Sequence, residues 1–261
     1  MSDVDVIVLD IDGGAMLAEC LASIRAQSVP SRVLVFDNGS RVPVRVDAEV
    51  FRSETNLGFA GGANAAYRQS GAPYVALVNN DVVLQPGWLA AVVDALDRDP
   101  QLAAVQTINR RIDGRIDGAG IDVSDGTFRQ IGHGEVVGAP LGVAWGVSAT
   151  AALYRRSAVG AQLFDERFFA YYEDVELSAR LRAGGWRTAV LPVVLATHRG
   201  SSSAGVLGGN ALRLRTRNRY FVARLHRGAG RVGALLWEDA RLALRGRTSL
   251  RGVIEGLCST L

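Results

Sequence analysis

The sequence predicts an α/β protein built on a mostly parallel central sheet. Short apolar segments alternate with amphipathic helical segments over the first half of the chain, which is the pattern of parallel strands connected by helices. Polar clusters follow directly after two of the apolar segments, at residues 37–40 and 79–81. Open α/β sheets bind ligands at the carboxyl ends of their strands, so these clusters also indicate where a site should lie.

Each element is predicted from its own local pattern. Apolar segments bounded by turn residues indicate strands, and apolar residues at helical spacing indicate helices. The predicted strands are residues 4–9, 32–36, 49–52, 74–78, 102–106, 150–155, 188–191 and 194–197. The predicted helices are residues 16–27, 61–69, 87–96 and 173–183, with a helical, arginine-rich segment from residue 212 onward. Residues 109–140 lack periodicity, so we expect an irregular excursion or short hairpins there.

The two cysteines fit a protein of a reducing compartment. Cys20 lies in a helical pattern with Leu17 and Leu21, so we expect it in the core. Residues 3–9 are acidic and strand-like, without the basic start and apolar core of a signal peptide. These features predict a cytoplasmic protein.

Charge is distributed unevenly along the chain. All 29 basic residues are arginine, and residues 199–261 hold 12 of them against three carboxylates. A basic tail on an acidic body suggests an anionic partner such as phospholipid headgroups or nucleic acid, with a salt-bridged helical surface as the alternative. The charge is confined to the tail, and no zinc-ligand spacing or aromatic RNA-reading motif accompanies it. We therefore expect no nucleic-acid partner. A nucleic-acid-binding protein is kept as the less favoured alternative from a different functional class.

Several strand ends carry residues suited to a nucleotide ligand. Asp37 could accept hydrogen bonds from a base or a ribose, although an aspartate at this place also caps turns. Residues 56–64 form a Gly-rich loop that leads into a helix, where free backbone N–H groups suit a phosphate. Asp81 could hold Mg²⁺ or Mn²⁺ bridging a diphosphate, with His198 as a second ligand. A turn cap for Asp81 and a structural role for His198 remain open.

Residues 171–177 combine two tyrosines with three carboxylates at the start of a predicted helix. A carboxylate held at a helix start in a partly apolar site can serve as a general base. Asp174 is the candidate for this role.

Taken in order, residues 37–40, 56–64, 79–82 and 164–177 resemble the motifs of the family 2 glycosyltransferases. The similarity is closest to the bacterial rhamnosyltransferase-like branch and extends over about residues 3–200. The resemblance implies a GT-A fold, a nucleotide-diphosphate sugar donor, a divalent metal (Mg²⁺ or Mn²⁺) and inversion at the anomeric carbon. The donor could carry dTDP, UDP or GDP.

The resemblance also implies roles residue by residue. Asp174 matches the catalytic base and Glu173 its acceptor-side neighbour. Asp81 matches the last acid of the family's metal-binding DxD motif, and His198 matches a histidine that completes the metal site in some relatives. The residues expected to bind the nucleotide sugar are Asp10, Asp37, Asn38, Asn56, Gly58, Phe59, Gly62, Asn64, Asn79 and Asn80.

Asn79 departs from the family pattern, because the DxD motif begins with an acid. An amide is a neutral and weaker ligand, so metal affinity should fall or depend more on the diphosphate. Because of this departure, one alternative is that the protein is a non-catalytic relative of the family that only binds a sugar nucleotide. Relatives of this branch often carry Asn-Asn-Asp, so we expect an active enzyme. The expected reaction transfers a sugar, with rhamnose suggested by the branch, to a hydroxyl of a glycan or lipid-linked acceptor in a single displacement.

The resemblance divides the chain into a catalytic domain and an extension. We expect the catalytic domain over residues 1–205, with a nucleotide-sugar-binding half to about residue 106 and an acceptor and catalytic half over residues 107–205. Residues 206–261 form a basic helical extension. It could contact anionic lipid at the inner face of the membrane, or pack on the catalytic domain or on a second subunit of a homodimer.

Overall fold

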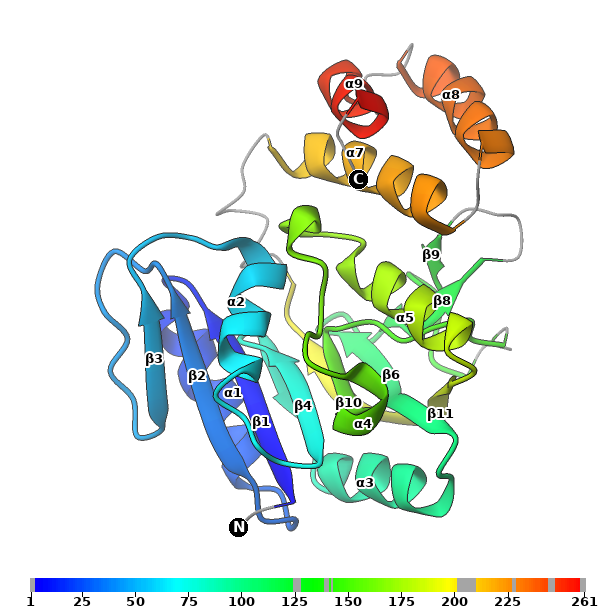
Figure 1. Ribbon diagram of the computed structural model, residues 1–261. Helices are drawn as coiled ribbons and strands as arrows, with labels where there is room; N and C mark the ends of the chain where they lie inside the picture. Colours follow the sequence, from blue (N-terminus) through cyan, green and yellow to red (C-terminus); the bar gives the residue numbers. More distant parts are fainter. Residues whose placement is uncertain are drawn as a thin grey trace.

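A mixed sheet forms the centre of the molecule (Figure 1). The computed structural model describes residues 3–123, 128–138, 141, 143–200, 210–226, 229–243 and 247–258. The strands of the main sheet are β1 (Val4–Asp10), β2 (Arg32–Asn38), β3 (Glu49–Ser53), β4 (Tyr74–Asn79), β5 (Val82–Leu84), β6 (Leu102–Arg111), β7 (Ile116–Gly118), β10 (Ala151–Arg155) and β11 (Arg187–His198). They lie in the order β3-β2-β1-β4-β10-β6-β11-β5, with β7 beside β6. Within this order only β10 and β5 run against the others, so the predicted α/β fold with a mostly parallel sheet is confirmed.

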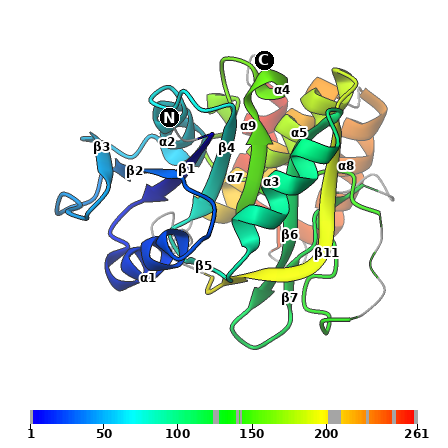
Figure 2. The ribbon, with the colours of Figure 1, turned by 90° about the horizontal axis from the view of Figure 1, so that it is seen from below.

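Helices cover both faces of the sheet (Figure 2). On one face, α1 (Gly14–Arg25) and α3 (Trp88–Arg98) pack on a core that includes Cys20 and Trp88. On the other face lie α2 (Gly58–Tyr67), α4 (Arg156–Val159) and α5 (Glu173–Ala183). Cys20 is fully buried as predicted, and burial raises the pKa of its thiol to about 12.

The structure corrects the predicted elements in two places. The two strands predicted over 188–191 and 194–197 are wrong, because β11 is one continuous strand. Its register shifts between Leu191 and Val194, and this irregularity accommodates Pro192, which has no N–H for a regular ladder. The sequence also missed β5, which has only three residues. The excursion at 109–140 contains β7 and a small ribbon of β8 (Ile121–Asp122) and β9 (Arg129–Gln130), so its short hairpins are confirmed.

The basic extension is helical, as predicted, and part of it packs on the part of the chain that carries the central sheet. Helix α7 (Asn210–His226) contacts α5 and the 3₁₀ turn η1 (Glu166–Phe168), and α8 (Ala229–Ala243) and α9 (Leu250–Cys258) pack on α7 (Figure 1). Ion pairs within the extension join Arg213 and Arg251 to Glu255, and Arg219 to Glu238 and Asp239. The predicted domain boundary at 205/206 lies outside the described residues. Within the described ranges, none of the helices is both long enough and apolar enough to cross a membrane.

Asp239 connects α8 to α7 and provides a test of how the extension is held. Its carboxylate is buried and bonds to the guanidinium of Arg219 and, at 2.6 Å, to the hydroxyl of Tyr220. Asp239→Ala leaves the Arg219 cation buried without its main partner, so we expect the free energy of unfolding to fall by about 3 kcal/mol in urea titrations followed by circular dichroism. Asp94→Ala, which breaks an exposed pair with Arg98, should change it by less than about 1 kcal/mol. Equal losses in the two variants would contradict this account of the extension.

Candidate functional site

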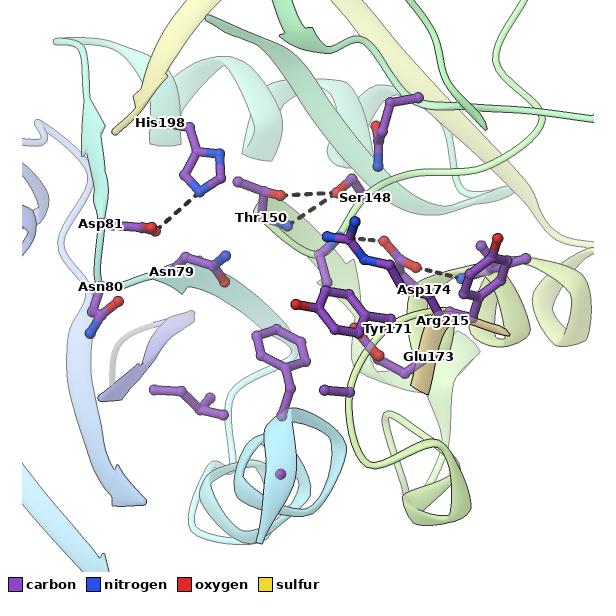
Figure 3. A pocket seen from close by; sticks show the side chains of 18 of the residues that line it. Asn79, Asn80, Asp81, Ser148, Thr150, Tyr171, Glu173, Asp174, His198 and Arg215 are labelled. Carbon is purple, nitrogen blue, oxygen red and sulfur yellow. Dashed lines mark hydrogen bonds and ion pairs between the residues drawn. The ribbon is translucent and has the colours of Figure 1, made fainter. Parts of the chain in front are cut away.

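A cavity of about 840 Å³ opens at the carboxyl ends of β1 and β4 and extends to the start of α5. Figure 3 shows Asp81 and His198 on one side of this cavity and Glu173 and Asp174 on the other. The predicted site residues that line it are Asp10, Asn38, Asn56, Gly58, Phe59, Asn79, Asn80, Asp81, Glu173, Asp174 and His198. Three predicted residues, Asp37, Gly62 and Asn64, lie outside its lining. The excursion contributes Phe128, Arg129, Gln130 and His133 to the wall.

His198, at the end of β11, joins two carboxylates. Its Nε2 lies 3.2 Å from Asp81 Oδ1, and its Nδ1 lies 2.8 Å from Asp117 Oδ2. Burial lowers the pKa of His198, but the two carboxylates outweigh this effect and raise the pKa to about 10. Asp117 lies on β7 and was not predicted from the sequence, yet it fixes the orientation of the ring.

The donor atoms at this end of the cavity suit a divalent cation. Asp81 Oδ1 and His198 Nε2 form an ion pair at 3.2 Å, close to the roughly 3 Å that separates two adjacent ligands of one octahedral Mg²⁺, so a cation bound here would replace the proton on Nε2. Asn79 Oδ1 is buried and accepts no hydrogen bond from the described residues. Within those residues, no group of three or more His, Cys, Asp or Glu side chains is arranged to hold a metal. A cation at this place would therefore take several ligands from a bound diphosphate and from water.

Asp10 and Asn80 connect the ends of β1 and β4 at the floor of the cavity. Asn80 Nδ2 donates to Asp10 Oδ1 at 2.6 Å, and the N–H of Gly13 donates to Asp10 Oδ2 at 3.2 Å. Burial raises the pKa of Asp10, while these two hydrogen bonds act in the opposite direction. A Cβ at position 13 would lie 2.0 Å from Asp10 Oδ1, so glycine is required for this close approach.

Asp37 forms the turn after β2 and is fully buried. Its carboxylate accepts the N–H groups of Ser40 at 2.9 Å and Val44 at 3.1 Å, and it pairs with the guanidinium of Arg52. Burial raises the pKa of Asp37, but these hydrogen bonds outweigh the effect and leave its pKa below the ordinary value. Both oxygens are therefore engaged in the turn, which the sequence had left open as an alternative to nucleotide contact.

The Gly-rich segment packs directly against the loop that precedes α5. Asn38 fixes its start, because Oδ1 accepts the N–H of Leu57 at 2.9 Å and Nδ2 donates to the carbonyl of Gly58 at 2.9 Å. Gly58 has φ 75°, and a Cβ there would lie 2.5 Å from the carbonyl oxygen of Phe169. The same oxygen accepts the N–H of Ala60 at 3.0 Å. The two segments therefore form one continuous wall of the cavity.

Asn64, one turn further along α2, fixes the start of the same loop. Its Nδ2 donates to the carbonyl of Phe164 at 2.8 Å, and its Oδ1 accepts the N–H of Phe164 at 3.0 Å. Gly62 lies beside Asn38, where a Cβ would come within 3.1 Å of Asn38 Nδ2. Both residues thus support the cavity wall from behind.

Asp174 lies in the first turn of α5 and is half-buried. Its Oδ1 accepts the N–H of Val175 at 2.8 Å, and its Oδ2 lies 3.4 Å from the N–H of Ala149. Burial raises the pKa of Asp174 above the ordinary value, and these hydrogen bonds oppose the shift. Glu173 is buried, and its Oε2 accepts no hydrogen bond from the described residues. Burial, together with the charge of Asp174, raises the pKa of Glu173 well above the ordinary value.

The loop before α5 has an unusual backbone. Phe169, Tyr171 and Tyr172 all have positive φ, at 62°, 70° and 70°, and each such residue costs about 1–3 kcal/mol. Nδ2 of Asn218 in α7, which is fully buried, lies within hydrogen-bond distance of three carbonyl oxygens of this loop, and its two N–H groups are shared among them. The oxygens belong to Phe168, Ala170 and Tyr171, at 2.8, 2.8 and 2.6 Å. The extension therefore holds the segment that leads into Glu173 and Asp174.

Arg215 of α7, which lies on the side of the helix that borders the cavity, was also not predicted from the sequence. It lines the cavity and lies over the ring of Tyr171, 4.4 Å from the ring centroid (Figure 3). In the sequence it is one of many arginines of the tail, so nothing distinguishes it. Asn218 carries a weak signal, because an amide between apolar residues at helical spacing must find partners when it is buried.

Comparison with known proteins identifies the family of this chain. Residues 6–161 match the family model described as glycosyl transferase family 2. In an alignment 290 residues long, the chain is 29% identical to the N-acetylglucosaminyl-diphospho-decaprenol L-rhamnosyltransferase of Mycobacterium tuberculosis (strain ATCC 25618 / H37Rv). This similarity covers 96% of the chain and 92% of the relative.

Solved structures share the fold. Residues 1–349 of S. aureus TarS in complex with UDP-GlcNAc match with a TM-score of 0.60 and 18% identity, over 90% of this chain and 70% of that one. The mannosyltransferase PcManGT from Pyrobaculum calidifontis, in complex with GDP-Man and Mn²⁺, matches with a TM-score of 0.58 and 16% identity, over 98% and 87%. These neighbours confirm the GT-A-like architecture that the motifs implied. Because the family model covers more than half of its length, the chain belongs to glycosyl transferase family 2 and is a glycosyltransferase.

Proposed function

We propose that this glycosyltransferase moves a sugar from a nucleotide-diphosphate donor to a hydroxyl of a lipid-linked acceptor, with inversion at the anomeric carbon. One observation carries the proposal: a single cavity has Asp81 and His198 on one side and Asp174 on another (Figure 3). A single displacement needs the leaving diphosphate and the attacking hydroxyl on opposite faces of the sugar. Asp81 and His198 are suited to the leaving diphosphate, and Asp174 is suited to the attacking hydroxyl.

Asp81 and His198 are proposed to hold a divalent cation, Mg²⁺ or Mn²⁺, with Asn79 beside them. Such a cation neutralises charge on a leaving diphosphate. The 3.2 Å spacing of the two donor atoms supports this site, as does the oxygen of Asn79, which accepts no hydrogen bond from the described residues. The Mn²⁺ in the PcManGT complex supports the class of metal. Asp117 is proposed to orient the ring of His198, since a metal-ligating histidine is commonly fixed by a carboxylate on its other nitrogen.

Asp174 is proposed to act as the general base. The acceptor oxygen forms a bond to the anomeric carbon while the bond from that carbon to the diphosphate oxygen breaks, and the hydroxyl proton passes to the Asp174 carboxylate. Burial makes Asp174 a stronger base than an exposed aspartate, which brings its pKa nearer to the working pH. Glu173, with its still higher pKa, is proposed to stay protonated beside it, because two adjacent buried carboxylates do not both ionise readily.

The class of acceptor is proposed from the mycobacterial relative, whose name describes a sugar joined through a diphosphate to decaprenol. The same name supports rhamnose as the transferred sugar. Exposed apolar side chains on α8 and α9, namely Leu236, Trp237, Leu250 and Ile254, support a peripheral contact with a lipid surface. A thermal-shift panel of dTDP-, UDP- and GDP-sugars, with and without Mn²⁺, identifies the donor, because ligand stabilisation reports affinity.

Removing the base gives the first test. Asp174→Asn keeps the shape of the side chain and removes its basicity, so we expect kcat to fall by about 10²–10⁴-fold. Donor affinity, measured by isothermal titration calorimetry, should stay within twofold of wild type, because Asp174 lies on the side of the cavity away from Asp81. Asp94→Asn on α3 is the control and should leave kcat unchanged. Wild-type turnover in Asp174→Asn would exclude Asp174 as the base.

The raised pKa of Asp174 predicts the pH profile of the wild-type enzyme. The base works only when ionised, so kcat/KM should fall with a slope of one as pH drops through this raised pKa. Because the shift is upward, the fall should begin at a higher pH than the ordinary aspartate value of about 3.9 allows. We expect it in a pH series of initial rates with the donor saturating. A flat profile down to about pH 4 would contradict the proposed environment of the base.

Asp117→Asn tests the metal end of the cavity without changing a proposed ligand. Loss of the carboxylate that orients His198 should weaken Mn²⁺ affinity by about tenfold, measured by calorimetry with the nucleoside diphosphate present. Asp113→Asn, in the exposed turn between β6 and β7, is the matched control and should leave Mn²⁺ affinity unchanged. If Asp117→Asn binds Mn²⁺ like wild type, His198 does not depend on Asp117 for this role.

A further inference from the structure

A second, smaller cavity lies beside the first one, between the β8–β9 ribbon and helices α7 and α8. Its volume is about 140 Å³. Arginines dominate its polar lining, with Arg129 from β9, Arg219 from α7 and Arg231 from α8, against the single carboxylate of Glu238. We call these three arginines and the space between them the arginine groove.

The arginines of the groove differ in how far the protein neutralises them. Arg219 is held in place by Glu238 and Asp239, yet its Nε is buried and donates no hydrogen bond among the described residues. Arg231 is half-buried, and no carboxylate of the described residues lies within ion-pair distance of it. Arg129 is exposed at the rim. Among the described residues, Arg231 is therefore a cation of the groove without a carboxylate partner, and an anion with several oxygens would neutralise it.

The arginine groove lies next to the active-site cavity and shares part of its wall. Phe128, Arg129 and Tyr172 line both spaces. Tyr172 directly precedes Glu173 and Asp174 in the chain, and its ring packs edge-on against Phe128 at 6.1 Å. Burial raises the pKa of Tyr172, and Arg219 and Arg215 act against this rise, so both cations lie within electrostatic reach of its hydroxyl. A ligand could thus place a hydroxyl at Asp174 and an anionic group in the groove.

Helix α8, which forms one wall of the groove, also carries exposed apolar side chains. Leu235 of α8 contributes to the lining of the groove, and the next two residues, Leu236 and Trp237, are exposed. An acceptor that carries a sugar, then a diphosphate and then a lipid would meet Asp174, the arginine groove and α8 in that order.

We propose that the arginine groove binds the diphosphate that joins the acceptor sugar to its lipid. This inference rests on the proposed function and adds a binding site for the acceptor that is separate from the donor's own diphosphate at Asp81. Guanidinium groups suit this ligand because their planar N–H donors match phosphate oxygens in pairs. Arg231 supplies most of the affinity for the anion, Arg129 adds N–H donors at the rim, and Arg219 shapes the groove while it also ties α7 to α8.

Direct binding to the full chain tests the groove. The probes are a soluble N-acetylglucosaminyl-diphospho-farnesol and a matched analogue in which a neutral ether of the same length replaces the diphosphate. Wild type should bind the diphosphate probe at least tenfold more tightly than the ether in calorimetry. Arg231→Gln, and more strongly the pair Arg129→Gln and Arg231→Gln, should weaken the diphosphate probe by about tenfold or more and leave the ether unchanged. Arg251→Gln, which removes an exposed arginine of α9, is the control and should bind both probes like wild type.

Several results would overturn the assignment. The assignment is wrong if wild type binds the two probes with equal affinity, or does not measurably bind the diphosphate probe. It is also wrong if the groove variants lose affinity for both probes equally, or if Arg231→Gln and Arg251→Gln lose affinity for the diphosphate probe equally. A further binding measurement uses phosphatidylglycerol vesicles without acceptor. If the groove variants lose vesicle binding but keep the diphosphate probe, the groove takes phospholipid headgroups and the proposal is wrong.

These outcomes are distinct from failure of the proposed function. If no nucleotide sugar stabilises the chain against heat and none is transferred, the proposed function fails, whereas probe binding is still read without a donor. If donor binding and transfer proceed but Arg231→Gln does not raise the acceptor KM, only the groove assignment fails. Where transfer proceeds, the donor KM of Arg231→Gln should stay at the wild-type value.

Discussion

The arrangement of the site depends on one buried amide. Asn218 of α7 shares the two N–H groups of its Nδ2 among three carbonyl oxygens of the loop that leads into Glu173 and Asp174. Three non-glycine residues of this loop adopt positive φ, at a cost of about 1–3 kcal/mol each. A net gain of about 1 kcal/mol per hydrogen bond does not offset this cost, so packing must contribute as well. Buried Phe168 supplies part of it, because its ring meets that of Phe221 edge-on at 5.9 Å.

This dependence gives the C-terminal extension a role in the catalytic centre itself. Helix α7 carries Asn218, which holds the loop, and Arg215, which stacks on Tyr171 inside the cavity. On its other side the loop meets the Gly-rich segment, where Gly58 allows close approach of Phe169. The proposed base is therefore fixed from two directions, by the Gly-rich segment and by the extension. The charge of the tail, which looked in the sequence like a surface for an anionic partner, is used in part for internal ion pairs such as Arg213 with Glu255.

The sequence carried enough information for the fold, the family and most of the cavity wall. A strand-end polar cluster led to Asp81 because parallel strands bring their carboxyl ends to one edge, and this rule needs no side-chain detail. Asp10 was expected from the family resemblance. The same reasoning could not separate residues that face the cavity from those that support it. Asp37 and Asn64 lie in the right segments but bond to Val44 and Phe164 of the protein. Asp117, Arg215 and Asn218 were out of reach, because their partners lie far away in the chain and are paired only by tertiary packing. Whether each residue performs its assigned role stays a prediction.

The central claim is that α7 positions the proposed base, and a double-mutant cycle of single-turnover rates tests it most directly. The four proteins are wild type, Asn218→Ala, Asp174→Asn and the double variant, each with donor and acceptor saturating and each confirmed as folded by circular dichroism. If Asn218 acts through Asp174, Asn218→Ala slows wild type by at least about tenfold but has almost no further effect once Asp174 is replaced, since coupled residues are non-additive. If the two losses simply multiply, Asn218 stabilises the protein without positioning the base, and the account is contradicted.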